Sequence, residues 1–137
     1  MNAVKKPIQW KALFVGLLIA EIVPIAILFA LVAVFGPAEQ QAATDYATRL
    51  GRMVGPIGGT MMGFIVAAKI GRKSSAPVQQ GLLLGMGLAI LDTVFLLVAN
   101  APFEWLLVLS NTLKILGSGA GGALAAANNR YEGQATT

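Results

Sequence analysis

The stretch ALFVGLLIAEIVPIAILFALVAVF, residues 12–35, is apolar along its whole length except for one charged residue, Glu21. A helix needs roughly 20 residues to cross the hydrocarbon core of a bilayer, which is about 30 Å thick. This stretch is therefore long enough to span a membrane. Three further stretches of similar character follow it, at about residues 53–70, 79–99 and 104–126.

The composition of the whole chain agrees with a membrane location. Of its 137 residues, 56% are hydrophobic and only 12% are charged, whereas about 25% of the residues of an ordinary soluble domain are charged. The mean hydropathy is +0.73. We therefore expect an all-α, polytopic membrane protein, with four transmembrane helices in one compact bundle that forms a single domain, and a flexible tail at residues 131–137.

The basic residues predict the orientation of these spans, because Lys and Arg are enriched in cytoplasmic loops. Only Arg49 and Arg52 fall in the loop between the first and second spans. Seven basic residues fall on the other side, namely Lys5, Lys6, Lys11, Lys69, Arg72, Lys73 and Arg130. The sequence thus predicts a multi-pass protein of a bacterial inner membrane with both termini in the cytoplasm. The pI near 9.8 then reflects topology, and no nucleic-acid partner is predicted.

Several kinds of chemistry are excluded by composition. The chain has no Cys and no His, so disulfides, Cys/His zinc sites, haem ligation by His and His-based acid/base catalysis cannot be built from it. Neither a phosphate-binding loop nor a nucleophile elbow occurs in the sequence. We predict a protein that is not an enzyme, with no catalytic residue, cofactor or metal.

Two octamers indicate an internal duplication. GLLIAEIV, residues 16–23, and GLAILDTV, residues 87–94, align at an offset of 71 and place Glu21 opposite Asp92. The second and fourth spans align at an offset of 59, and a longer first loop accounts for the difference. Two tandem helical hairpins entering from the cytoplasm explain this pattern, although chance recurrence of Gly, Ala and Leu remains an alternative. The predicted repeats are residues about 10–72 and 78–130.

Glycines spaced four residues apart predict where the helices pack. Small residues let helix backbones approach closely in a bilayer, where the hydrophobic effect gives little attraction between helices. The predicted packing positions are Gly51, Gly55, Gly59, Gly63, Gly81, Gly85, Gly117 and Gly121. They serve either packing within one bundle or the interface of a homo-oligomer, and glycines on three helices favour some self-association.

Three charged residues fall in the middle half of their predicted spans: Glu21, Asp92 and Lys114. A charge at the centre of a bilayer costs about 2.5–3.5 kcal/mol on insertion scales, so these side chains should face protein or water. One interpretation is an ion pair between Lys114 and one of the two acids that locks the helices together. The other is that the remaining acid loads and releases a proton or ion, with Ser110 and Asn111 extending the polar path.

The loop at residues 38–50, AEQQAATDYATRL, carries apolar and small side chains along one helical face. It predicts either a short amphipathic helix lying at the membrane interface or a longer connector without such a role.

Two classes of function fit these features. The first is permeation or proton-coupled transport of a small solute or ion by a homo-oligomer, with the site residues Glu21, Asp92, Lys114, Asn111 and Ser110. The second is a noncatalytic accessory or scaffold subunit, whose charges serve only helix assembly with partner membrane proteins. Both place the chain in contact with the lipid bilayer.

Overall fold

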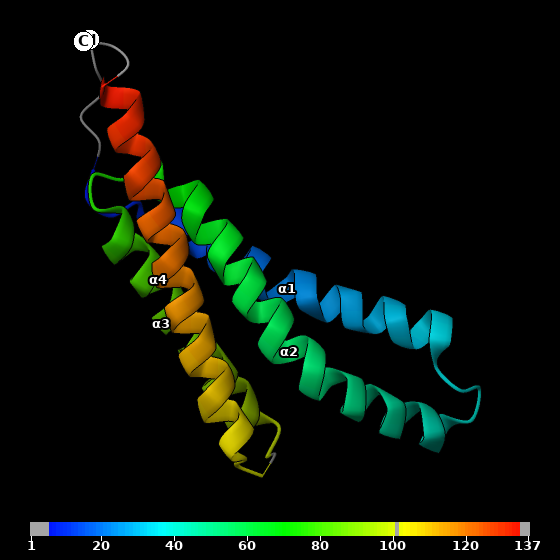
Figure 1. Cartoon of the computed structure of the whole chain (residues 1–137). Coiled ribbons are helices and arrows are strands. Elements are labelled where there is room, and N and C mark those ends of the chain that lie inside the picture. Colours follow the sequence, from blue (N-terminus) through cyan, green and yellow to red (C-terminus); the bar gives the residue numbers. More distant parts are fainter. Residues whose placement is uncertain (1–5, 101, 135–137) are drawn as a thin grey trace.

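The computed structural model describes residues 6–100 and 102–134, and this part of the chain is all-helical (Figure 1). Its four helices are α1 (Trp10–Phe35), α2 (Gln40–Gly71), α3 (Pro77–Val98) and α4 (Trp105–Gln134). The predicted all-α fold is thereby confirmed. Three of these helices, α1, α2 and α3, are long and apolar enough to cross a membrane. α4 is long enough, with 30 residues, but it is not among these three helices. Its polar residues and glycines lower its mean hydropathy.

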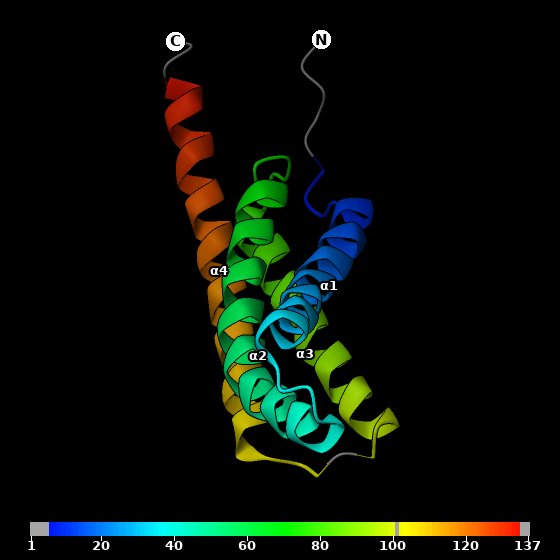
Figure 2. The same ribbon diagram turned by 90° about the vertical axis from the view of Figure 1, so that its right-hand side faces the viewer.

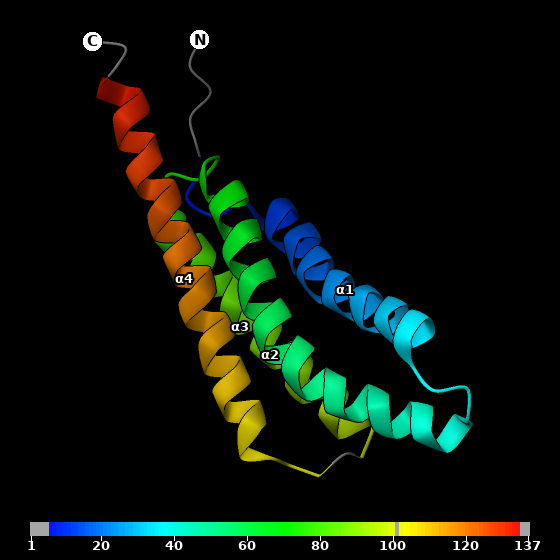
Figure 3. The ribbon, with the colours of Figure 1, turned by 45° about the vertical axis from the view of Figure 1, so that its right-hand side comes forward.

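The loop expected between the first two spans is mostly part of α2. This helix begins at Gln40 and has 32 residues, which corresponds to about 48 Å at 1.5 Å per residue. The helix predicted at 38–50 is present from Gln40 onward, but it is the first part of α2 and not a short helix of its own, and the alternative of a long connector is wrong. Residues 40–55 contain no proline and are rich in helix formers, so the helix continues without a break. α2 changes direction along its length (Figure 3), and Pro56 inside it explains the bend.

The last helix is also longer than expected. α4 continues to Gln134, so residues 131–134 of the predicted flexible tail are helical. Residues 135–137 lie outside the described part of the chain.

The helices pack asymmetrically. α2 contacts each of the other three helices, and α3 contacts α1 and α4. In the described residues no Cα atom of α1 lies within 8 Å of one in α4, and Figure 2 shows α2 between them. If a two-fold axis related the two predicted hairpins, the contact between α1 and α4 would be equivalent to the contact between α2 and α3. α2 and α3 touch, whereas α1 and α4 do not, so α1 stands further from the bundle than this symmetry requires.

The two ends of the molecule differ in charge. The start of α1, the α2–α3 loop and the end of α4 lie at one end (Figure 1), which we call the basic end. The connections between α1 and α2 and between α3 and α4 lie at the opposite end, which we call the hairpin end. Toward the hairpin end the α1–α2 pair diverges from the α3–α4 pair (Figures 1 and 3). Described residues at the basic end are Lys6, Lys11, Lys69, Arg72, Lys73 and Arg130.

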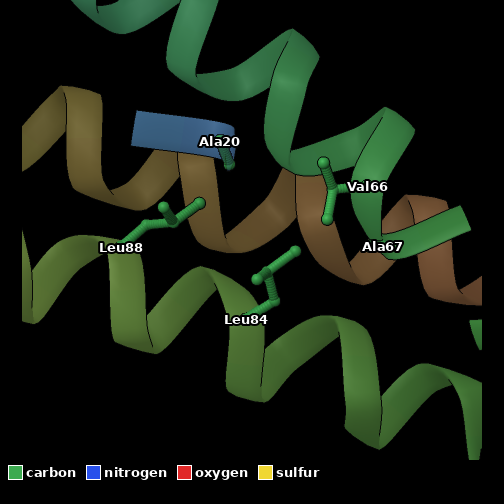
Figure 4. Packing of buried hydrophobic residues seen from close by; sticks show 5 residues of the cluster. All are labelled: Ala20, Val66, Ala67, Leu84 and Leu88. Atoms are coloured by element: carbon green, nitrogen blue, oxygen red, sulfur yellow. The ribbon is translucent and has the colours of Figure 1, made fainter. Parts of the chain in front are cut away.

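A small apolar core holds α1, α2 and α3 together on the basic-end side (Figure 4). It consists of Ala20, Val66, Ala67, Leu84 and Leu88, of which Ala67, Leu84 and Leu88 are fully buried. These side chains are small or medium in size, which lets the helix backbones lie close together. This core closes the space between the helices over about one turn of α3, from Leu84 to Leu88.

The segment before α1 is fastened to the start of α3 by a buried carboxamide. Gln80 has no exposed surface. Its Oε1 accepts a hydrogen bond from the Gln9 backbone N–H at 2.8 Å, and its Nε2 donates to the Gln9 carbonyl at 3.3 Å. The buried Ser74 hydroxyl donates to the Pro7 carbonyl. These bonds close the bundle at the basic end and satisfy the Gln9 N–H and the Pro7 carbonyl, which lie outside the helix, while the Gln9 carbonyl also accepts from the Leu13 N–H.

Replacing Gln80 with Leu should lower the free energy of unfolding by about 1–3 kcal/mol, because the half-buried Gln9 backbone N–H loses its acceptor. The adjacent Gln79 is exposed, so Gln79→Leu is a matched control with an expected change below about 0.5 kcal/mol. Denaturant unfolding in detergent measures both. Equal effects of the two substitutions would contradict the structural role of the Gln80 carboxamide.

Candidate functional site

The three charged residues predicted to lie at membrane depth meet in one place. The Lys114 ammonium, from α4, lies 2.7 and 2.9 Å from the two carboxylate oxygens of Asp92, from α3. It also lies 3.2 Å from Oε1 of Glu21, from α1. Lys114 is 4% exposed, and the two acid side chains are 12% and 16% exposed. We call these three residues the charge cluster.

The expected single pairing of Lys114 is replaced by a double one. An ammonium carries three N–H donors, so one lysine can serve two carboxylates at once. The contacts with Asp92 are shorter and use both carboxylate oxygens, whereas Glu21 contributes one longer contact. Glu21 is therefore the more weakly held of the two acids. With all three groups ionised, the charge cluster carries one negative charge in excess.

Gly59 explains how Lys114 reaches Glu21 although α1 and α4 do not touch. A Cβ atom built on Gly59 would overlap Cε of Lys114 and lie 3.1 Å from its Nζ. The lysine side chain thus runs from α4 across the bare backbone of α2 to reach α1. Any larger residue at position 59 would occupy the volume that the lysine stem now fills.

A cavity of about 340 Å³ adjoins the charge cluster, and we call it the central cavity. Glu21, Asp92 and Lys114 all contribute to its wall. Gly51 and Gly55 line it from α2, and a Cβ on Gly55 would meet nothing within 4 Å. A space of this size can hold several water molecules, and the three charged groups in its wall supply polar partners for them. The remaining lining residues come from all four helices, and only Ser110 among them is polar: Pro24, Ile25, Leu28, Val54, Gly59, Phe95, Leu96, Leu107 and Ser110.

Ser110 is the predicted polar residue that enters this cavity. It is 7% exposed and lies one helical turn before Lys114 on α4, so both face the same way. No hydrogen bond within the described part of the chain uses its hydroxyl, in contrast to the hydroxyls of Thr93 and Thr112, which bond within their helices. The hydroxyl is thus available to a ligand or a water molecule in the cavity.

Asn111 lies apart from the cavity. Its Nδ2 donates to the Ala89 carbonyl of α3 at 3.4 Å, while its Oδ1 is buried without a partner among the described residues. Asn111 therefore joins α3 to α4 and is not part of the wall that holds the charge cluster. Ser110 and Asn111 were predicted to extend one polar path, but only the former lines the cavity.

A second cavity, of about 620 Å³, lies toward the hairpin end, and we call it the mouth cavity. It shares Gly51, Leu96, Leu107 and Ser110 with the central cavity. An ion pair crosses it, because Arg52 of α2 donates to Glu104 before α4 at 3.0 Å. The sequence did not predict this pair, because Arg52 falls in the loop between the first two predicted spans and Glu104 at the start of the fourth. Their opposite charges were the only signal.

The predicted packing glycines divide into two groups. At six of them a Cβ atom would lie closer than 3 Å to an atom of a neighbouring helix. Gly59 and Gly63 face Lys114 and Ser118, Gly117 and Gly121 face Thr60 and Phe64, and Gly81 and Gly85 face Ser118 and Ile115. The other two, Gly51 and Gly55, line the central cavity. The absence of side chains therefore brings helices together toward the basic end and leaves open space toward the hairpin end.

Comparisons of the chain with protein-family models, with curated proteins and with solved structures return no match. Its function is therefore inferred from the geometry of the charge cluster and the cavities.

Two glycines one turn apart on α2 should respond differently to alanine. Gly59→Ala collides with the Lys114 stem and should destabilise the protein by about 1–3 kcal/mol. Gly55→Ala adds a methyl group in open space, so it should be neutral or stabilise by up to about 1 kcal/mol. Unfolding in detergent compares the two variants. Tolerance of alanine at both positions would show that the lysine does not need the bare backbone at position 59.

Proposed function

We propose that this chain is an integral membrane protein of a bacterial inner membrane, with all four helices crossing the bilayer. α4 is included because its polar residues Ser110, Lys114 and Ser118 are buried inside the bundle, so they need not meet lipid. Large apolar side chains are exposed on the outer surface, such as Phe29 at 71% and Val98 at 76%. Soluble proteins rarely expose apolar surface on this scale.

We propose that the basic end faces the cytoplasm, because six of the described cationic residues gather there. The natural absence of cysteine makes this orientation simple to test with single cysteines and a membrane-impermeant thiol reagent. Cysteine at Ser75, in the α2–α3 loop, should react only after the cells are permeabilised. Cysteine at Gln41, near the start of α2, should react in intact spheroplasts. The reverse pattern would show that the orientation is inverted.

We propose that the protein carries out permeation or proton-coupled transport of a small solute or ion. The observation that carries this proposal is the central cavity, which reaches both carboxyl groups and the lysine of the charge cluster. A purely structural ion pair needs no space beside it, and a buried pair with no function contributes little net stability. Glu21 and Asp92 are the proton or ion sites in this proposal, and Lys114 is their counter-charge.

The transport step follows from the competition for the two carboxylates. When a proton or another cation arrives at Glu21, the Lys114 ammonium loses its longer contact and stays with Asp92. When the cation leaves, the ammonium returns to both acids. The charge of the site thus changes by one unit between its two forms, which is the basis for coupling a solute or ion to a proton.

A homo-oligomer is part of the proposal. Six of the eight predicted packing glycines are used between helices of one chain, so they are not available to a second copy. An apolar groove of about 400 Å³ between α1 and α2, lined by residues such as Ile27, Met53 and Ile57, is a surface that a second copy could cover instead.

A noncatalytic accessory or scaffold subunit is the second candidate. The observation that favours it is that all three charged groups contact one another and that Lys114 is almost fully buried. In this case the charge cluster only ties α1, α3 and α4 together, and the cavities have no ligand.

Neutralising the acids one at a time separates these functions. In liposomes with an imposed membrane potential and an entrapped pH dye, Glu21→Gln and Asp92→Asn should each reduce proton flux to that of empty liposomes. Both variants should remain folded, because an amide carbonyl still accepts a hydrogen bond from the Lys114 ammonium. The exposed Glu39 provides the control substitution Glu39→Gln, which should leave the flux unchanged.

Loss of expression or unfolding in both variants would instead support the scaffold role. Normal folding together with unchanged proton flux would remove the support for transport through these acids.

A further inference from the structure

We infer that the central cavity binds one small monovalent cation, which enters from the hairpin end and competes with the Lys114 ammonium for Asp92 and Glu21. This inference rests on the proposed transport function and specifies the class of the transported ion and the side from which it arrives. Three independent features lead to it: the net charge of the cluster, the unused hydroxyl of Ser110 and the arrangement of the two cavities.

The charge of the ion follows from the charge cluster. Two carboxyl groups share one ammonium, so with all three ionised the site lacks one positive charge. Uncompensated charge is costly in a medium of low dielectric constant. One monovalent cation brings the site to neutrality, whereas a divalent cation would leave it with an excess positive charge.

The ligand groups follow from Ser110. Ser110 as a residue is 7% exposed and lines the central cavity, and within the described residues its hydroxyl makes no hydrogen bond. Most hydroxyls in largely buried side chains have a partner, so an unused hydroxyl in the same cavity wall as two carboxylates points to a partner in the cavity. Hydroxyl and carboxylate oxygens are the atoms that hard metal cations bind and that the N–H groups of an ammonium ion donate to.

The route follows from the packing on either side of the charge cluster. Toward the hairpin end, the mouth cavity shares Ser110 and three other lining residues with the central cavity. Toward the basic end, the buried side chains of Leu84, Leu88 and Ala67 fill the space between the helices (Figure 4). The charge cluster is therefore accessible from the hairpin end, where the exposed Arg52–Glu104 pair crosses the entrance.

The experiment uses single cysteines in the full chain, which has none of its own. Ser110→Cys is treated in sealed membrane vesicles of known orientation with two impermeant methanethiosulfonates of similar size, one a trimethylammonium cation and one a sulfonate anion. The cationic reagent should react about tenfold faster or more, because a cleft of one charge sign concentrates the opposite ion. Reaction should occur from the hairpin end.

Cation binding is measured as protection from the cationic reagent. Sodium, potassium or methylammonium chloride replaces the chloride of a bulky cation, N-methylglucamine, at constant ionic strength. We expect at least one of them to slow the reaction several-fold. Protection by sodium or potassium identifies a metal ion as the ligand, and protection by methylammonium identifies an ammonium ion. Introducing Asp92→Asn should bring the ratio of the cationic to the anionic rate toward one.

Two further cysteines make the result independent of the folding of one variant. Gly55→Cys lies in the same cavity with open space for a side chain and should show the same preference and protection. Leu116→Cys is the control, because it is 62% exposed on the outer face of α4 and lines neither cavity. Its labelling should be slow with both reagents, because a lipid-facing thiol is out of reach of charged reagents in water, and it should not respond to the added cation.

Equal rates for the two reagents, reaction only from the basic end, or no protection by any of the three cations at both cavity cysteines would overturn the inference. Labelling does not require flux, so the two proposals can fail separately. Charge-selective, cation-protected labelling without proton flux would keep the binding site and reject transport. If proton flux depends on Glu21 but labelling of the cavity cysteines does not depend on the charge of the reagent, the transport proposal stands and the cation site is rejected.

Discussion

The arrangement of the helices depends on one buried ammonium group. Lys114 is 4% exposed, and a lysine buried inside a helix bundle requires counter-charges close by. Asp92 and Glu21 supply them from α3 and α1. The lysine therefore joins three helices at a single point. The backbones of α1 and α4 do not touch, and Lys114 connects these two helices through its contact with Glu21. The positions of α1 and of the bare backbone at Gly59 follow from this requirement.

The glycines have two opposite effects on the same helix. At Gly63 the missing side chain lets α2 approach Ser118 of α4, whereas at Gly55 it leaves space that no neighbouring atom fills. Close packing stabilises a membrane bundle because small residues permit extensive backbone contact. Open space gives up that contact. The change from one effect to the other occurs between Gly55 and Gly59, the glycine that contacts Lys114. Toward the hairpin end the α1–α2 pair diverges from the α3–α4 pair (Figure 1).

The two sides of the charge cluster differ as a result. On the basic side, the apolar core around Leu84 and the hydrogen bonds of Gln80 close the bundle. On the hairpin side, two cavities with shared walls extend from Lys114 to the Arg52–Glu104 pair. A carrier that exposes its site to one side at a time needs such an asymmetry, and a second conformation would have to close one side and open the other.

The sequence by itself determined the all-α fold, because apolar stretches of membrane length can satisfy their backbone groups only as helices or closed barrels. It also singled out Glu21, Asp92 and Lys114, because charges are rare and costly in such stretches. It did not determine where α2 begins, since the amphipathic pattern before Leu50 fits a separate helix equally well. Only the tertiary structure decided that Lys114 serves both acids, that Ser110 but not Asn111 lines the cavity, and that Gly55 adjoins open space. These outcomes depend on how four helices are rotated and spaced, and residue patterns along single helices do not fix that geometry.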